Sequence, residues 1–250
     1  MYRRLLALVS ASVLLAPMAR AAELEVMSAG AMEPGLAQAV QAFRNASDHS
    51  VQIRYATAPA LQQALADGDA PQLLIGPDSL MVGLAQAGRL AGQPVTLGRV
   101  GVGMVVRPDV AIGPVTDAEG LRRAVVGAQS VVFNRASTGL YMERLFERMG
   151  LTAAVAPKAR RYRTGAEVMA HLLHGRGQEI GFGAITEIRK VRELRYLGPL
   201  PAELQSYTTY SAALAPGAPV AAEALLRWLT GPEARSAYEA AGIETDPPAR

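Results

Sequence analysis

The chain of 250 residues contains no cysteine, only two lysines and few aromatic residues, which make up 5% of it. Without cysteine no disulfide can form, so stability has to come from a buried core. Half of the residues are hydrophobic, which suffices for such a core at this length. The apolar stretch from Leu5 to Leu15 is shorter than the roughly 20 residues that a membrane-spanning helix needs.

The first 21 residues have the pattern of a secretory signal peptide. Arg3 and Arg4 precede the apolar stretch, and Ala19-Arg20-Ala21 matches the A-x-A cleavage pattern. We therefore expect cleavage after Ala21 and a periplasmic protein. An uncleaved anchor is the alternative, but no charged stop-transfer segment follows Pro17. Export argues against functions that need cytoplasmic ATP, NAD or a genome.

Once this segment is removed, the basic and acidic side chains of the chain are equal in number. The full chain has a formal net charge of +3, with 25 basic and 22 acidic side chains. The first 21 residues carry three arginines and no acid, so the remainder has a net charge of zero. Neither nucleic acid nor an anionic membrane surface is therefore indicated as a partner.

Short apolar runs alternate with helical patterns along the rest of the chain. The patterns predict strands at 24–27, 51–55, 72–75, 95–106, 130–133, 179–182, 194–197 and 207–215. They predict helices at 32–46, 60–66, 138–149, 166–174, 220–230 and 232–241, and one that begins at Asp78 as its N-cap. Strand–helix–strand order of this kind favours parallel sheets covered by helices.

The order of elements predicts an α/β protein of two lobes, each a mostly parallel sheet flanked by helices. We place the first part of lobe 1 at 22–98, lobe 2 at 99–206, and the return to lobe 1 at 207–250. The β segments at 95–106 and 207–215 would cross between the lobes as two hinge segments. A ligand is then expected in the cleft between the lobes, at the carboxyl ends of strands.

Hydroxyl-bearing or glycine residues stand at four places where a strand or loop leads into a helix. They are Ser28-Ala29-Gly30-Ala31, Thr57-Ala58, Ser137-Thr138-Gly139 and Thr164-Gly165-Ala166. Helix N-termini present unpaired N–H groups and partial positive charge, which suits anions. Ordinary capping explains any one of them, but together they predict a small anion held between the lobes.

Five segments resemble, in order and spacing, the molybdate-binding periplasmic component of ABC transporters, a type II periplasmic binding protein. The segments are 26–32 (V-M-S-A-G-A-M), 55–61, 68–75, 137–141 and 231–234. The resemblance extends from residue 24 to about 243. It implies a monomeric receptor without enzymatic activity, cofactor or bound metal. Such a receptor would bind an oxyanion of the molybdate or tungstate class and deliver it to an inner-membrane permease.

The resemblance also implies which residues contact the ligand. They are Ser28, Ala31, Thr57, Ala58, Thr138, Ala166 and Ala184. Thr57 stands where the related receptors have a serine, and Thr138 and Ala166 would contribute backbone N–H groups. Ala31 and Ala184 stand where those receptors have hydroxyls, which leaves the set of hydroxyl donors incomplete.

A small organic carboxylate is the alternative ligand. Arg135 lies just before a predicted helix, and an arginine fork pairs well with a carboxylate. Arg160, Arg161 and Arg163 also precede a helix, and we interpret this cluster as a solvated basic loop.

Signals for an enzyme or a metal site are few. Glu167, His171 and His174 share one predicted helical face, but the sequence places no further ligand beside them. Ser137 lies in no G-x-S-x-G elbow, and no histidine–aspartate pair is indicated by spacing. A secreted hydrolase is therefore the less favoured alternative, and a histidine within hydrogen-bond reach of Ser137 would support it.

Overall fold

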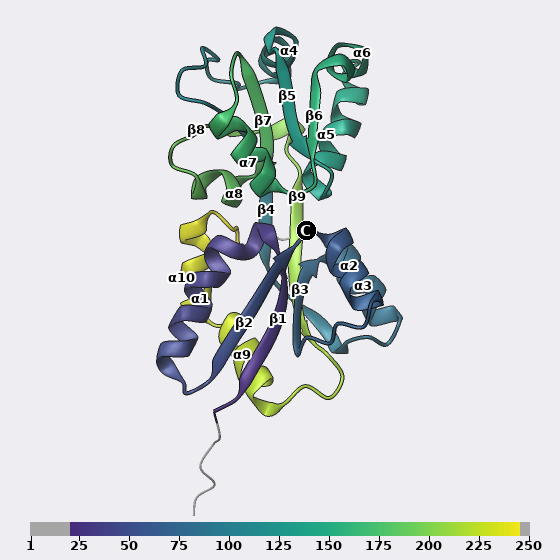
Figure 1. The fold of residues 1–250 in the computed structure, drawn as a ribbon, viewed down its shortest axis with the longest axis vertical. Helices are drawn as coiled ribbons and strands as arrows, with labels where there is room; N and C mark the ends of the chain where they lie inside the picture. Colours follow the sequence, from purple (N-terminus) through teal and green to yellow (C-terminus); the bar gives the residue numbers. More distant parts are fainter. Residues whose placement is uncertain (1–20, 246–250) are drawn as a thin grey trace, which may run out of the picture.

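The computed structural model describes residues 21–245. Two lobes are stacked along the long axis of the molecule, and strands β4 and β9 connect them (Figure 1). The predicted signal peptide lies outside the described residues, except for Ala21. No helix within 21–245 is long and apolar enough to span a bilayer.

The strands of the described chain form one nine-stranded mixed sheet in the order β2-β1-β3-β9-β4-β7-β5-β6, with β8 paired to β4. Their bounds are β1 Glu23–Ala29, β2 Ser50–Ala56, β3 Leu73–Pro77, β4 Ala91–Val106, β5 Ser130–Asn134, β6 Ala159–Tyr162, β7 Glu179–Ala184, β8 Arg195–Pro199 and β9 Tyr207–Leu214. The predicted α/β fold is confirmed. Each lobe combines a parallel set, β2-β1-β3 or β6-β5-β7, with antiparallel strands, so its sheet is mixed rather than mostly parallel.

Ten α-helices cover this sheet within the described residues. They are α1 Glu33–Ala46, α2 Ala58–Ala66, α3 Asp78–Gln86, α4 Ala118–Gly127, α5 Ser137–Arg148, α6 Thr152–Val155, α7 Gly165–His174, α8 Ile185–Lys190, α9 Val220–Leu229 and α10 Pro232–Ala241. A 3-10 turn, η1 (Gly30–Met32), precedes α1. Helix α1 buries Leu36, Ala39, Val40 and Phe43, the face that the apolar spacing predicts.

Two sets of core residues define the lobes. Lobe 1 contains β1–β3, α1–α3, α9 and α10, and its core combines residues 24–100 with residues 210–243 and with Ala184 at the end of β7. Lobe 2 contains β5–β8 and α4–α8, and its core comes from residues 102–200. Strand β4 pairs with β9 in the first sheet region and with β7 and β8 in the second, so it continues from one lobe into the other. Lobe boundaries at 98/99 and 206/207 stay a prediction, as does a hinge motion.

Several local expectations were wrong. Helices α4, α6 and α8 were not predicted. The arginines at 160 and 161 belong to β6, paired to β5, rather than to a loop. Asp78 is the first residue of α3 and not its N-cap, which is Pro77. The Asp78 carboxylate instead accepts a hydrogen bond from the Ser211 hydroxyl of β9.

A buried ion pair joins Arg107, the residue after β4, to β7 inside lobe 2. Arg107 Nη1 lies 2.8 Å from Glu179 Oε2, and the two side chains are 10% and 6% exposed. Glu179 Oε1 lies 3.0 Å from His171 Nε2, whose ring also hydrogen-bonds the Tyr162 hydroxyl. Burial alone would raise the pKa of Glu179, but hydrogen bonds from Arg107 and His171, together with their charges, hold it below its ordinary value.

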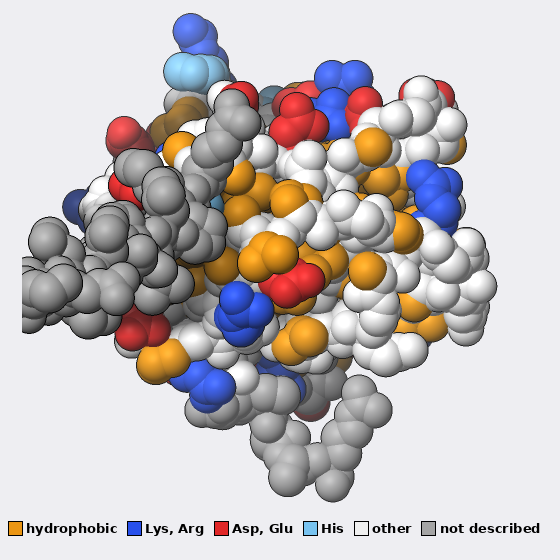
Figure 2. All heavy atoms as spheres, turned by 90° about the horizontal axis from the view of Figure 1, so that it is seen from below, with side chains coloured by type: hydrophobic (Ala, Val, Ile, Leu, Met, Phe, Trp, Pro, Cys, Tyr) orange, Lys and Arg blue, Asp and Glu red, His pale blue; other side chains and the backbone are white. Residues whose placement is uncertain are grey.

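The surface at the lobe 1 end shows no large field of one charge. Figure 2 views this end and shows Lys or Arg and Asp or Glu side chains interspersed with one another and with hydrophobic and neutral ones, on the part that described residues form. The view agrees with the balanced charge of the sequence after residue 21.

Candidate functional site

A cavity of about 160 Å³ lies between the lobes. Lobe 1 and β9 supply Ala29, Gly30, Ala31, Glu33, Tyr55, Ala56, Thr57, Ala58, Pro77 and Tyr210 to its wall, and lobe 2 supplies Asn134, Ala136, Ser137, Thr138, Thr164, Gly165, Ala166, Ala184 and Glu187. An engineered cavity of roughly 150 Å³ holds benzene, so this space suits a small molecule. Two larger grooves adjoin it, one sharing Pro77, Ser137 and Thr138 and the other sharing Ala58, Ala136 and Ser137.

Helix N-termini from both lobes meet at this cavity. Gly30, Ala58, Ser137 and Gly165 are the first residues of η1, α2, α5 and α7, and all four line its wall. The first N–H groups of each helix have no partner inside the helix, and the helix dipole adds partial positive charge. The cavity is therefore built to attract negative charge without any lysine or arginine in its wall.

The α5 terminus is held by Asn134, the last residue of β5. Its side-chain oxygen accepts hydrogen bonds of 3.0 Å from the N–H groups of Ala136 and Gly139. At α7 the Thr164 hydroxyl accepts from Glu167 N at 3.1 Å, which is ordinary capping. The Thr57 hydroxyl makes no capping bond to α2, which leaves it available at the cavity wall.

Six of the eight predicted contact residues line the cavity: Ala31, Thr57, Ala58, Thr138, Ala166 and Ala184. The structure does not bring the other two there. Ser28 is fully buried in β1, where its hydroxyl donates to Ala29 O. Arg135 is exposed and is not part of the wall. Arg161 pairs with Glu143, and Arg163 pairs with Glu167, both away from the cavity.

Sequence reasoning missed Glu187, the third residue of α8. Its carboxyl lies at the cavity, where a Cβ on Gly165 would come within 1.9 Å of Oε2 and a Cβ on Gly30 within 3.5 Å of Oε1. The space beside these two glycines thus accommodates the carboxyl. No sequence signal marks it, because a six-residue helix after a strand has no clear periodicity.

Burial raises the pKa of Glu187 from an ordinary value of 4.5 to about 7. A hydrogen bond from the backbone of Ala184 and the charge of Lys190 oppose the rise, and the carboxylate of Glu33 adds to it. The carboxyl is therefore balanced between its charged and neutral forms near neutral pH.

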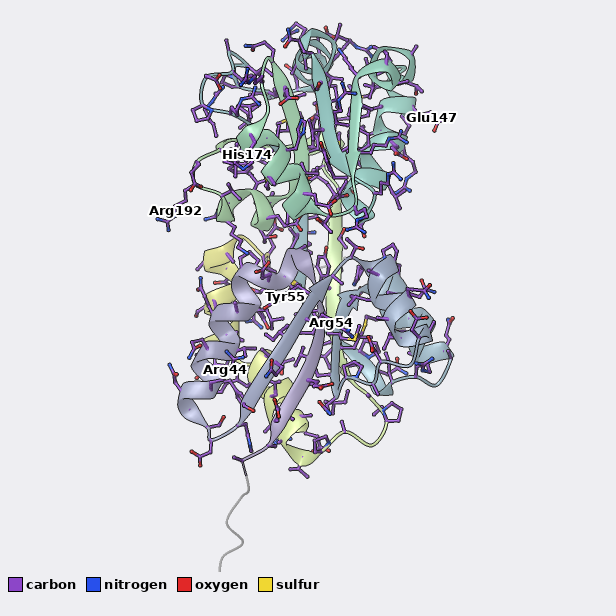
Figure 3. The ribbon with its side chains drawn as sticks, in the orientation of Figure 1. Arg44, Arg54, Tyr55, Glu147, His174 and Arg192 are labelled. Atoms are coloured by element: carbon purple, nitrogen blue, oxygen red, sulfur yellow. The ribbon has the colours of Figure 1, made fainter. Side chains whose placement is uncertain are left out.

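Two phenol groups belong to the same wall. The Tyr55 hydroxyl is buried and has no hydrogen-bond partner among the described residues, and burial raises its pKa to about 12. Figure 3 shows Tyr55 at the end of β2 near the junction of the lobes, whereas Glu147 and Arg192 point outward from lobe 2. Burial, with a contribution from Glu187, also raises the pKa of Tyr210. Both phenols stay protonated at neutral pH and can donate hydrogen bonds.

Helix α8 also fastens lobe 2 to lobe 1 beside the cavity. The buried Thr186 hydroxyl donates to Ala31 O at 2.7 Å, and Lys190 Nζ lies 2.6 Å from Glu33 Oε1. Glu187 lies between these two contacts in the chain, so its position is tied to the way the lobes meet.

We expect Glu187→Gln to stabilise the ligand-free protein at pH 8 by about 2 kcal/mol and to have little effect at pH 4.5. Because the pKa of Glu187 is raised in the folded protein, the neutral carboxyl costs no stability below about pH 4.5. Stability is then lost as the pH rises through about 7 and the buried carboxyl becomes charged. Glutamine keeps an oxygen for the Ala184 N–H but carries no charge. Urea unfolding at both pH values measures the difference, and equal effects at the two pH values would contradict it.

No histidine lines the cavity or hydrogen-bonds Ser137 among residues 21–245. His171 is engaged with Tyr162 and Glu179, and His49 accepts a hydrogen bond from Ala22 N. The described part of the chain also contains no group of three or more His, Asp or Glu side chains placed to hold a metal ion. The hydrolase hypothesis thus gains no support from the geometry.

Comparison with known proteins agrees with this arrangement. The chain is 28% identical over 233 residues to an aconitate isomerase of a Pseudomonas species, covering 90% of this chain and 88% of that protein. The periplasmic molybdate-binding protein of Azotobacter vinelandii superposes with a TM-score of 0.76 at 18% identity, over 90% of this chain and all of the other. PEB3 of Campylobacter jejuni, solved with L-phospholactate, superposes with a TM-score of 0.70 at 10% identity, over 89% of this chain and all of the other.

The model of one family matches residues 24–244, nearly the whole described structure. This match includes both lobes and every residue of the cavity wall. The chain belongs to the bacterial extracellular solute-binding proteins.

Proposed function

We propose that this chain is the extracytoplasmic receptor of an ABC transporter and that its ligand is a small organic carboxylate. The carboxylate would be held in the interlobe cavity and delivered to an inner-membrane permease. The observation that carries the choice of ligand is Glu187, a carboxyl in the wall of a cavity that otherwise attracts anions. In its neutral form this carboxyl can donate a hydrogen bond to a carboxylate oxygen of the ligand, whereas its charged form would repel any anion.

The rest of the wall supports a ligand with a carbon skeleton. Eight of its members are alanine or proline: Ala29, Ala31, Ala56, Ala58, Pro77, Ala136, Ala166 and Ala184. Apolar wall with a few polar groups at fixed places suits an organic acid. Molybdate offers only oxygens, each of which needs a donor, and the hydroxyl donors that its receptors place at positions 31 and 184 are alanine here. The molybdate-class expectation from the sequence therefore ranks second.

Calorimetry on the protein without residues 1–21 separates the two ligand classes. We expect a di- or tricarboxylate to bind with a Kd of about 1 µM or tighter, near −8 kcal/mol, and molybdate and tungstate to give no heat. Thr57→Val is expected to weaken carboxylate binding by about 1 kcal/mol through loss of its hydroxyl. Sub-micromolar molybdate binding with no heat from any carboxylate would contradict the proposal.

A second candidate function uses the same cavity. The relative of 28% identity is an aconitate isomerase, and the match covers both lobes. Isomerisation of an unsaturated tricarboxylate needs a group that exchanges protons near neutral pH, which the raised pKa of Glu187 provides. Proton NMR of cis-aconitate incubated with the protein tests it directly, because the trans isomer gives a separate olefinic signal.

A further inference from the structure

We propose that Glu187 takes a carbon-bound proton from the bound carboxylate and returns it to another carbon of the same ligand. The inference rests on the proposed binding of an organic carboxylate in this cavity, and it assigns a catalytic residue to the second candidate function. The geometry behind it is the buried Glu187 carboxyl, which lies in the same small cavity as the N-termini of α2, α5 and α7.

Two contacts fix the position of the Glu187 carboxyl. The backbone of Ala184 hydrogen-bonds it, and the absence of a side chain at Gly165 leaves the space that its oxygens occupy. A glutamate at the third position of a helix that reaches back to the N-cap backbone is also an ordinary cap. Capping explains the hydrogen bond to Ala184, but it does not require the carboxyl to lie in the cavity wall.

The charged groups around Glu187 keep both of its protonation states accessible, so it can accept a proton and release it again. Glu33 from α1 opposes a negative charge at Glu187, and Lys190 of α8 favours it. These opposed effects, together with burial, keep the carboxyl near the midpoint of its titration at pH 7. A base with a pKa near the working pH is effective both as acceptor and as donor.

The proton transfer balances without any other reactant. In an unsaturated acid with a CH₂ group next to the double bond, the Glu187 carboxylate takes one CH₂ proton. The C–H electron pair forms a new double bond, and the electrons of the old one move toward a conjugated carboxylate. Glu187 then returns the proton to the far carbon of the three, so the double bond has moved by one carbon.

The helix N-termini contribute to the intermediate of this transfer. Negative charge that moves onto the carboxylate oxygens would face the N-terminal N–H groups of α2, α5 and α7. Fixed donors in a site shielded from water stabilise such developing charge more than water does. The cavity thus has the two features that the reaction requires: a carboxyl that transfers the proton, and helix N-termini that stabilise the negative charge of the intermediate.

Deuterium exchange tests the role of Glu187 independently of net isomerisation. The protein lacking residues 1–21 is incubated with aconitate in D₂O, and loss of the CH₂ and olefinic proton signals is followed by NMR. We expect exchange by the unmodified protein, with a rate that rises with pH around 7 because the carboxylate form is the base. Glu187→Gln keeps the hydrogen bond to Ala184 and should slow exchange at least about 100-fold.

Matched variants separate catalysis from folding and binding. Glu223→Gln, on the surface helix α9, should exchange at the unmodified rate, and Gly165→Ala should slow exchange because its Cβ displaces the Glu187 carboxyl. Calorimetry should show that Glu187→Gln still binds aconitate. Binding with neither exchange nor isomerisation by the unmodified protein, or equal rates for Glu187→Gln, overturns this inference alone. Absence of binding by every carboxylate overturns the proposed ligand, and this inference with it.

Discussion

Replacing Glu179 by alanine is expected to lower the free energy of unfolding by about 3–5 kcal/mol, because it leaves the charge of Arg107 buried without its partner. Arg107 would keep hydrogen bonds to the carbonyl oxygens of Leu172 and Gly177. Its remaining acidic neighbour, Asp109, lies 3.5 Å away and is 78% exposed. Neither replaces a buried carboxylate, and His171 also loses an acceptor.

The control is Glu143→Ala, which removes the acidic partner of Arg161 on the surface of the same lobe. An exposed pair of this kind contributes about 0–1 kcal/mol. The lowered pKa of Glu179 means that its stabilising effect is present above the ordinary carboxyl range and is lost as the pH falls through the lowered value. Urea unfolding at pH 7 should therefore separate the variants widely and at pH 3 less so. Equal losses for both variants at pH 7 would refute the assignment.

Gly139→Ala is expected to destabilise the protein by about 3 kcal/mol or more, although alanine normally stabilises a helix by about 1 kcal/mol over glycine. Gly139 is the third residue of α5, and a Cβ there would lie 1.6 Å from the carbonyl oxygen of Asn134. That oxygen belongs to the backbone at the end of β5, so it cannot swing away as a side chain would. The helix would have to move off the strand, which breaks the hydrogen bond from Gly139 N to the Asn134 side chain.

Gly83→Ala in α3 is the matched control, because a Cβ at Gly83 meets no atom within 4 Å. This change should stabilise the protein by about 0.5–1 kcal/mol. Thermal unfolding of the two variants should therefore shift in opposite directions. A shift in the same direction would show that the contact between α5 and β5 is looser than the structure indicates.

The positions of the anion-attracting helices could be predicted because their signals are local. Thr57-Ala58, Ser137-Thr138 and Thr164-Gly165 each combine a hydroxyl or glycine with the start of an apolar helical spacing, and the structure begins α2, α5 and α7 at these places. Parallel strand–helix order then brings such starts to one edge of a sheet. The two-lobed α/β fold follows from the same alternation.

The side chains that distinguish this cavity could not be predicted, because their position depends on how the lobes meet. Glu187 reaches the wall from a six-residue helix, and its neighbours Gly30 and Glu33 come from the other lobe more than 150 residues earlier. Arg135 precedes a helix start in the sequence, yet sequence adjacency does not say which way its side chain points. A four-residue strand rich in arginine, β6, has too little alternation to be recognised and lies at the sheet edge, where charge is common.

The place of β9 between β3 and β4 has a consequence for the order in which the chain can fold. Lobe 2 takes its core from one uninterrupted segment, residues 102–200, so its contacts can form as soon as that segment exists. Lobe 1 has to wait for residues 207–214 to enter between two strands made more than 100 residues earlier. Contacts of such long sequence separation form slowly. Until they do, the edges of β3 and β4 that will pair with β9 stay unpaired and can pair with other chains. Misassembly of the newly made protein is therefore expected mainly in lobe 1, whose first strands are synthesised early but whose sheet is completed only by β9.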